Sequence, residues 1–373
     1  MKRILFLGVV LIMLTSGFTT PFLNSTIYLP LVGTDSSINA SAVAAGPQTY
    51  TVLVGWDNGQ QGAMLMSYFP SVLTVHTGDT VKWVLNSMEI HTVTFLDGNP
   101  MPDFIVPAPQ NPVGPVMLNP QAFLPTVPPG GMYDGTTYAN SGLMQPSGNP
   151  NQPTTFSLTF TRPGSYDYVC LVHGMMMSGK IVVVDPSTSI LTPAQVNGRA
   201  HVEIASFMPK IAAAITTAFK TEVAPVKNPN GTTKFTVLVG YSAGQVDLMG
   251  FFPNKLVTHP GDTVEWKLSP TNDAPHTVTF LNGNPEPPTF IPVPQTNQPP
   301  LIVINGAILG PINAGKTLNK TDIFHSGFMD PTNPVMTPQN FTIKIGTATG
   351  TYNYFCMLHD TSGMLGSLKV VLP

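Results

Sequence analysis

Short runs of β-branched and aromatic residues, separated by glycine, proline and asparagine, dominate the hydrophobic pattern of the chain. Runs bounded by such turn-forming residues are typical of β-strands. Many short strands without helices between them favour an all-β sandwich. In the first half of the chain the predicted strands are Tyr50–Val54, Thr80–Leu85, Thr92–Leu96, Phe156–Phe160, Tyr166–Cys170 and Lys180–Val184.

One stretch near the middle of the chain has a helical period instead. Thr192-Pro193 has the form of an N-cap with proline at the first helical position. Pro209 should kink or split the helix, because it lacks a backbone N–H. The apolar face needs cover, so we expect the helix to pack against one or both flanking segments. Its apolar residues at helical spacing are Ile204, Phe207, Ile211, Ile215 and Phe219.

The sequence before this helix is repeated after it. Thr51-Val-Leu-Val-Gly55 recurs as Thr236-Val-Leu-Val-Gly240. His91-Thr-Val-Thr-Phe95 recurs as His276-Thr-Val-Thr-Phe280. Other repeated pairs are His76–Trp83 with His259–Trp266, Ser141–Met144 with Ser326–Met329, and Tyr166–His173 with Tyr352–His359. A unit of about 140 residues in two copies is too long and too few for a solenoid.

The repeat divides the chain into four predicted parts. Two all-β domains, residues 46–186 and 233–373, are joined by a helical linker, residues 187–232. Within the domains, residues 99–153 and 284–338 are rich in proline, asparagine and glycine, and we expect long excursions there, functional or disordered. Residues 233–373 should fold alone.

Residues 1–45 form the fourth part. Lys2 and Arg3 precede an apolar run, Ile4–Leu14, and small residues follow, which is the order of a secretory signal peptide. The run is short for a membrane span. The chain carries no further charge until Asp35, so an uncleaved N-terminal membrane anchor is the alternative. Either interpretation predicts a secreted, periplasmic or cell-surface protein, with a flexible linker before the first domain.

The charge content excludes one class of partner. Charged residues make up 9% of the chain and the net charge is −3. Nucleic-acid binding requires a basic face, which this composition does not provide.

The chain has two cysteines, Cys170 and Cys356, each followed three residues later by a histidine. One interpretation of two cysteines in an exported protein is a disulfide. Against it, both occupy the same position of the repeat. The alternative is a copper ligand set, because a thiolate with two imidazoles and a weak axial methionine suits Cu(I) and Cu(II) alike. The candidate ligands are His91, Cys170, His173 and a methionine from 175–177 in the first copy, and His276, Cys356, His359 and Met364 in the second.

The axial methionine is placed from its downstream side. Met177-Ser-Gly179 and Met364-Leu-Gly366 both lead into the last predicted strand of their copy, which selects Met177 over its two neighbours. The spacing from histidine to methionine is then four residues in the first copy and five in the second. Because the potential depends on the axial ligand and on the surroundings of the sulfur, we expect two unequal sites with two midpoint potentials.

These motifs resemble the cupredoxin family, close to plastocyanin-like and auracyanin-like blue copper proteins. The resemblance rests on Tyr-x-Tyr-x-Cys-x-x-His followed by Met-x-Gly, and on Gly-Asp-Thr-Val-x-Trp and His-Thr-Val-Thr-Phe, over residues 48–185 and 233–373. It implies a Greek-key β-sandwich and one type 1 copper per domain. It also implies that His173 and His359 have exposed edges that pass electrons to redox partner proteins. Thr92 and Thr277 depart from the family, where asparagine is common.

Three classes of function compete. An electron carrier without enzymatic activity fits two complete type 1 sets. A copper storage, sensing or surface-interaction protein is the alternative. A multicopper oxidase or nitrite reductase needs further histidines in His-x-His pairs or beside the cysteine, and this sequence has neither. The repeated His76 and His259 are interpreted as structural, and Trp83 and Trp266 as core residues.

Overall fold

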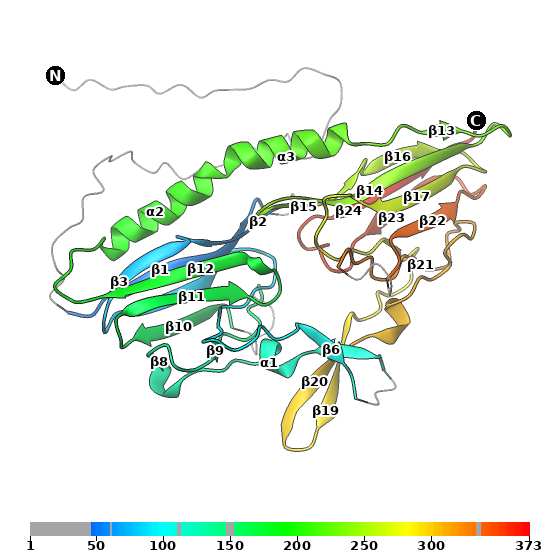
Figure 1. Cartoon of the computed structure of the whole chain (residues 1–373). Helices are drawn as coiled ribbons and strands as arrows, with labels where there is room; N and C mark the ends of the chain where they lie inside the picture. Colours follow the sequence, from blue (N-terminus) through cyan, green and yellow to red (C-terminus); the bar gives the residue numbers. More distant parts are fainter. Residues whose placement is uncertain (1–45, 60–61, 110–112, 147–152, 333–336) are drawn as a thin grey trace, which may run out of the picture.

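The computed structural model describes residues 46–59, 62–109, 113–146, 153–332 and 337–373. The signal or anchor predicted for residues 1–45 lies outside these residues. The fold is mostly β-sheet, with two sandwich domains and a helical segment between them, as the sequence predicts (Figure 1).

A single sheet of ten strands runs through both domains. Its path is β22-β17-β14-β15-β2-β1-β4-β10-β8, with β13 paired to β14. The first domain contributes β1 (Thr49–Asp57), β2 (Ala63–Phe69), β4 (Thr80–Leu85), β8 (Met132–Tyr133) and β10 (Thr155–Phe160). The second contributes β14 (Thr233–Ala243), β15 (Val246–Phe252), β17 (Thr263–Leu268) and β22 (Asn340–Lys344), and β13 (Val226–Lys227) comes from the linker.

Each domain closes its sandwich with a five-stranded sheet of its own. In the first domain the order is β3 (Val72–His76), β12 (Gly174–Val184), β11 (Gly164–Cys170), β5 (Thr94–Phe95) and β9 (Ala139–Asn140). In the second it is β16 (Lys255–Thr258), β24 (Leu365–Val370), β23 (Gly350–Phe355), β18 (Thr279–Phe280) and β21 (Phe324–His325). Trp83 and Trp266 are fully buried between the layers, as predicted for core residues.

The two domains meet where the edge strands β2 and β15 pair antiparallel, with Met64 opposite Asp247. Every residue of both strands is buried. Such strands lack the polar alternation of a half-exposed strand because both of their faces are covered. One face lies on the sandwich cores, and the other lies under the helical segment.

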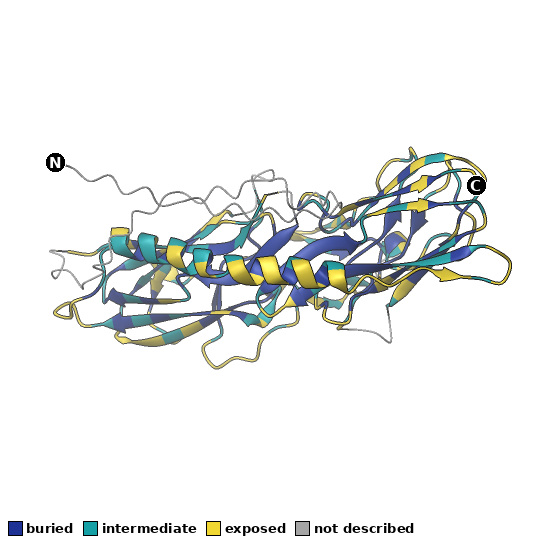
Figure 2. Cartoon of the chain, turned by 90° about the horizontal axis from the view of Figure 1, so that it is seen from above, coloured by how far each residue is buried: buried dark blue, intermediate teal, exposed yellow. Residues whose placement is uncertain are grey.

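That segment is split into α2 (Pro193–Ser206) and α3 (Met208–Lys220), with Phe207 between them. Pro209 occupies the first turn of α3, which explains the predicted break. The Thr192 side chain caps α2 in a capping box with Gln195. The segment packs against both domains, since the Phe207 ring meets Phe69 and that of Phe219 meets Phe252. Figure 2 shows its buried and exposed faces along the molecule.

Taken together, Pro193–Lys220 is long and apolar enough to cross a membrane by length and composition, and 22% of its apolar window is buried. Among the described residues it is the one helix that meets this test.

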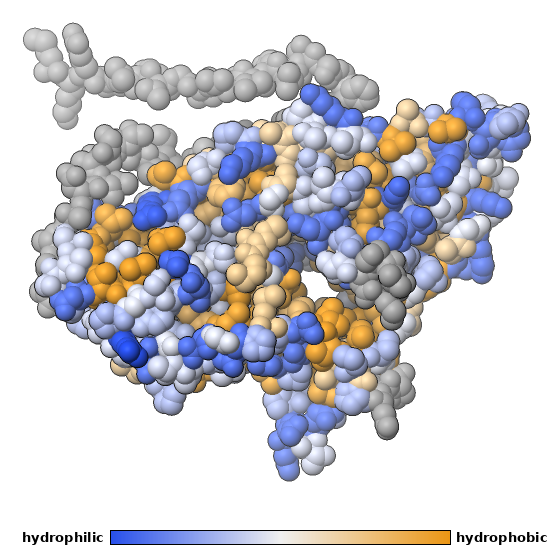
Figure 3. Space-filling view, viewed as in Figure 1, coloured by the Kyte–Doolittle hydropathy of each residue, from blue (hydrophilic) through white to orange (hydrophobic). Residues whose placement is uncertain are grey.

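The excursions form structure of their own. The strands β6 (Ile105–Pro107) and β7 (Val116–Leu118) from the first domain join β19 (Phe290–Gln295) and β20 (Gln298–Ile304) from the second in a four-stranded sheet. This gives the domains a second junction, which the proline-rich sequence did not predict. Figure 3 shows hydrophobic surface around this sheet, and Ile105 and Phe290 are exposed. The short helix α1 (Pro120–Phe123) and the 3₁₀ turns Pro129–Gly131 and Gly306–Ile308 complete the excursions.

Asp247, on β15 at the domain junction, is a buried carboxyl whose Oδ1 has no hydrogen-bond partner among the described residues. Burial, and then repulsion from Asp273, raise the pKa of Asp247 from 3.8 to about 8. The Asp247 carboxyl of the folded chain therefore keeps its proton at neutral pH, whereas that of the unfolded chain releases the proton above about pH 4.

We predict that Asp247→Asn stabilises the copper-free chain at pH 7 and has little effect near pH 3. The gain in the free energy of unfolding should grow as the pH rises from about 4 to about 8, because the wild type must hold a proton over that window. At pH 7 it should exceed about 1.4 kcal/mol, the equivalent of one pKa unit. Urea unfolding of both chains across this pH range measures it, and a gain that is the same at every pH would contradict the prediction.

Candidate metal centres

Each cysteine stands where a strand of the five-stranded sheet ends. Cys170 is the last residue of β11, and Cys356 directly follows β23. The histidine three residues later lies in the following turn. The remote histidine comes from a neighbouring segment just before β5 or β18, where His91 bridges Met144 and His276 bridges Met329. The fold thus brings a distant histidine to each Cys-x-x-His turn.

The three predicted donors of each copy form one group. Site 1 consists of His91, Cys170 and His173, and site 2 of His276, Cys356 and His359, with the ligand atoms of each group within 4.8 Å of one another. The Cys170 Sγ lies 3.9 Å from His91 Nδ1 and 3.4 Å from His173 Nδ1. The corresponding distances from Cys356 Sγ in site 2 are 3.9 Å and 3.4 Å. Both thiols are free and belong to separate sites, so the disulfide interpretation is wrong.

Five of the six donors are buried, His173 is partly buried, and the imidazoles are neutral. Burial lowers the pKa of His91 and His276 well below the usual value, and that of His173 to about 4. It raises the pKa of the Cys356 thiol to about 11. Neutral imidazole is the form that binds a metal ion. The thiol must lose its proton as a metal binds, because the thiolate is the ligand.

The rings of the remote histidines explain why both copies of the repeat have a glycine at the same position. Gly55 and Gly240 adopt positive φ angles, 69° and 66°. A Cβ atom at Gly55 would lie 2.5 Å from His91 Nε2, and one at Gly240 would lie 2.3 Å from His276 Nε2. Only glycine lets the backbone approach the ligand ring this closely.

The known proteins that this chain resembles agree with the donor sets. A family model described as copper binding proteins, plastocyanin/azurin family, matches residues 54–184 and again residues 237–371. This chain belongs to that family. Two imidazoles and a thiolate are the donors that type 1 copper sites use. The two groups therefore fit two copper ions, one in each domain.

Individual relatives cover single domains of this chain. Plastocyanin from Synechococcus sp. (strain JA-2-3B'a(2-13)) is 28% identical over 140 residues, which is 37% of this chain and 76% of that protein. Plastocyanin from Nostoc punctiforme (strain ATCC 29133 / PCC 73102) is 37% identical over 60 residues, 16% of this chain and 40% of that protein. Among solved structures, amicyanin from Paracoccus versutus is 21% identical and covers 39% of this chain and 88% of its own, with a TM-score of 0.21.

The two threonines that depart from the family take part in the copper sites. The backbone N–H groups of Thr92 and Thr277 donate to the cysteine sulfurs of their sites, both at 3.3 Å. Their hydroxyls accept hydrogen bonds from the N–H groups of Leu171 and Met357, both at 2.8 Å. Each threonine therefore ties the strand of the remote histidine to the cysteine turn.

Sequence reasoning missed the residues that orient the remote histidines. The hydroxyl of Ser87 lies 2.9 Å from His91 Nε2, and Asn272 Oδ1 lies 2.8 Å from His276 Nε2. Each stands four residues before its histidine, but the residue types differ, so a search for identical residues in the two copies does not find them. Such partners fix the ring orientation and the tautomer of a metal ligand. Because they differ, the two coppers of this chain have different surroundings.

The prediction that His359 has an exposed edge is wrong. His359 is 5% exposed, because the first domain covers it. Glu89 Oε2 of that domain lies 3.5 Å from His359 Nε2. The expectation carried over from the family describes a domain without a neighbour, whereas here the joined sheets bring a second domain against this face. His173 is partly buried.

The remaining repeated histidines have structural roles, as predicted. His76 Nε2 lies 2.7 Å from the carbonyl oxygen of Thr188, and its Nδ1 lies 3.6 Å from Asp79. His259 lies 3.7 Å from Asp262, the counterpart of Asp79.

The axial position of the methionines stays a prediction. Met177 and Met364 are both fully buried and belong to the same hydrophobic cluster as the two cysteines. Met175 is 69% exposed. Burial therefore agrees with the choice of Met177 from its cluster of three.

We predict that Met177→Leu shifts the midpoint potential of site 1 and leaves site 2 unchanged. Leucine fills the same volume without a sulfur, so the axial interaction is lost while packing is kept. Voltammetry of the copper-loaded chain measures both potentials, and Met175→Leu is the matched control. A large shift from Met176→Leu and none from Met177→Leu would place the axial ligand one residue earlier.

Proposed function

We propose that this chain is an exported electron carrier with one type 1 copper in each domain and no enzymatic activity. The observation that carries the proposal is the same set of two imidazoles and one thiol, built twice on matching turns. Copper held in such a set cycles between Cu(I) and Cu(II). The histidine and cysteine ligands would be His91, Cys170 and His173 in site 1, and His276, Cys356 and His359 in site 2, with Met177 and Met364 as axial ligands.

The residues around each set suit a site that changes little as an electron arrives or leaves. The remote imidazoles are held by Ser87 and Asn272, and the cysteine turns are held by Thr92 and Thr277. These contacts restrain the imidazole rings and the cysteine turns. A preorganised set has little to rearrange when the charge on the metal changes.

The histidine count argues against an additional copper centre of the kind found in oxidases. Four of the eight histidines belong to the two sites. Of the other four, His76 and His259 lie beside Asp79 and Asp262, and His325 bonds Thr279 and the carbonyl oxygen of Ile308. His201 lies on α2 with its ring bonded to the backbone.

We propose export because Lys2 and Arg3 precede the apolar run Ile4–Leu14, the order of a secretory signal. The partners that we propose are redox proteins outside the cytoplasm. Protein-film voltammetry of the copper-loaded full chain tests the function. We expect two reversible one-electron waves with the copper retained through repeated cycles. Copper that is redox-silent, or that is released on reduction, would support storage or sensing instead and would overturn the proposal.

A further inference from the structure

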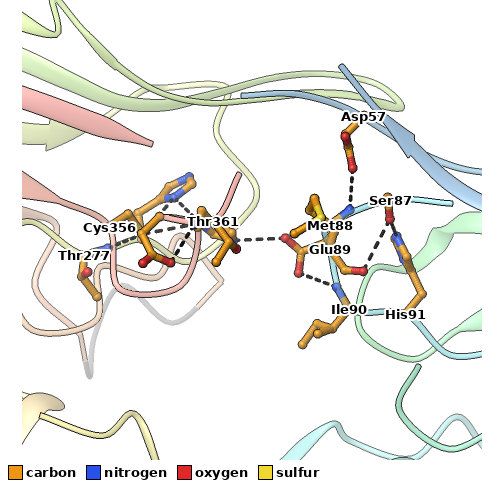
Figure 4. A network of polar contacts seen from close by, with 12 residues as sticks. Asp57, Ser87, Met88, Glu89, Ile90, His91, Thr277, Cys356 and Thr361 are labelled. Atoms are coloured by element: carbon orange, nitrogen blue, oxygen red, sulfur yellow. Dashed lines mark hydrogen bonds and ion pairs between the residues drawn. The ribbon is translucent and has the colours of Figure 1, made fainter. Parts of the chain in front are cut away.

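The segment from Ser87 to His91 lies at the domain junction and contacts the metal ligands of both domains. Glu89 Oε2 is 3.5 Å from His359 Nε2, with 10% of the glutamate side chain and 7% of the histidine side chain exposed. The opposite ring nitrogen, His359 Nδ1, is the one that faces the Cys356 sulfur. The first domain therefore holds the outer nitrogen of a site 2 ligand, and Figure 4 shows the network from Cys356 through Glu89 to His91.

The same segment is part of site 1. His91 is two residues after Glu89, and its ring is held by Ser87. Glu89 Oε1 accepts a hydrogen bond of 3.0 Å from the N–H of Ile90, the residue directly before His91. The carboxylate of Asp57 accepts a hydrogen bond from the N–H of Met88 and fixes the segment from the side of β1. The path from the His91 ring to the Glu89 carboxylate runs through covalent bonds. A contact of 3.5 Å then joins the carboxylate to His359.

Among the residues that the structure describes, only the first domain contributes a carboxylate of this kind to the other domain's site. Aligned on the remote histidine, the second domain has Ala274 where the first has Glu89. At the surface, the exposed Met175 lies two residues after His173 in site 1.

We propose that the two copper sites exchange electrons with each other inside the chain, and that Glu89 is the positioning residue that holds His359 for this transfer. Site 2 then reaches external partners through site 1, because its own histidine edge is covered. One electron moves from Cu(I) at one site to Cu(II) at the other, so one metal is oxidised as the other is reduced and no bond is broken. The inference rests on the proposed electron-carrier function and adds the route.

The first test removes site 1 from the full chain. In the Cys170→Ser chain, reduction of site 2 by a protein-sized reductant, followed by stopped-flow absorbance, should be at least tenfold slower than in the two-copper chain. The matched Cys356→Ser chain should reduce site 1 at the wild-type rate. Equal rates for site 2 with and without site 1 would overturn the proposal.

The second test changes the link and keeps both metals. Glu89→Ala should slow the reduction of site 2 at least tenfold. Glu89→Gln should restore most of the rate, because its amide oxygen can take the place of the carboxylate oxygen that lies 3.5 Å from His359 Nε2. The exposed Glu222→Gln removes the same charge elsewhere and should change nothing. Copper content and colour verify that each variant is loaded.

The midpoint potentials give a readout that a purely structural role would not move. At pH 8, Glu89→Ala in the Cys170→Ser chain should raise the potential of site 2 by about 59 mV, a tenfold change in the ratio of oxidised to reduced copper. The loss of a carboxylate beside the ligand disfavours Cu(II). Unchanged rates and potentials in the Glu89 variants, with both voltammetric waves still reversible, would overturn the link and leave the electron-carrier function standing. Loss of reversible waves in the wild type would remove that function itself.

Discussion

Replacing Cys170 with serine in the copper-loaded chain should remove one of two coppers and about half of the visible colour. The thiolate is the soft donor of each site and its covalent bond to the metal gives the colour, whereas a serine hydroxyl stays protonated and binds copper weakly. Cys170 and Cys356 lie in separate groups with the same geometry, so the losses should be independent. Metal analysis and absorbance spectra measure both.

Three companion variants complete this experiment. Cys356→Ser should remove the other half of the colour, and the double variant should be colourless. Met175→Leu changes an exposed residue near the start of β12, two residues after His173, and should keep both coppers. If one of the cysteine changes left the colour intact, that domain would hold no functional site.

The second domain should fold alone and bind one copper, but it should depend on α3 for much of its stability. Residues 233–373 contain the five-stranded sheet of this domain, its four strands of the shared sheet and the three donors of site 2. However, β15 is covered on its outer face by α3, where Ile211 is buried and the Phe219 ring lies 5.3 Å from that of Phe252. A fragment of residues 207–373 keeps this cover, and one of residues 233–373 loses it.

We expect the shorter fragment to be less stable by at least about 3 kcal/mol, the value for exposing two large apolar side chains. Urea unfolding of both fragments measures the difference. Phe219→Ala in the longer fragment should reproduce part of this loss. Equal stability of the two fragments would show that the helix does not cover this domain in solution, and failure of both to fold would show that the joined sheet is required.

The fold of each domain could be predicted from the sequence, but the junction between the domains could not. Strand runs and the repeat follow from local patterns, and the break at Pro209 follows from one residue. The pairing of β2 with β15 joins two edge strands from distant segments, and neither periodicity nor turn residues encode that contact. The one available signal was that neither strand alternates apolar with polar residues: β2 has one polar residue, Ser67, and β15 has one charged residue, Asp247. The predicted strand Thr92–Leu96 is shorter in the structure, Thr94–Phe95, because the segment before it turns to place His91.

The metal ligands could be predicted because the same residues recur in both copies of the repeat. The residues around them were missed where the two copies differ. Ser87 and Asn272 share a position but not a residue type. Glu89 has Ala274 at its equivalent position, so no comparison of the copies could mark it. The exposed edge expected for His359 was wrong for the same reason that Glu89 was missed: both depend on how one domain covers the other.

The most direct test of the central claim is the copper stoichiometry of the full chain together with its EPR spectrum. Loading the chain with copper and then analysing the metal should give two ions per chain, and the oxidised protein should be intensely coloured, with two distinguishable EPR signals of equal weight. Binding of fewer than two ions, or two ions that give no intense colour when oxidised, would contradict the assignment of a type 1 copper to each domain.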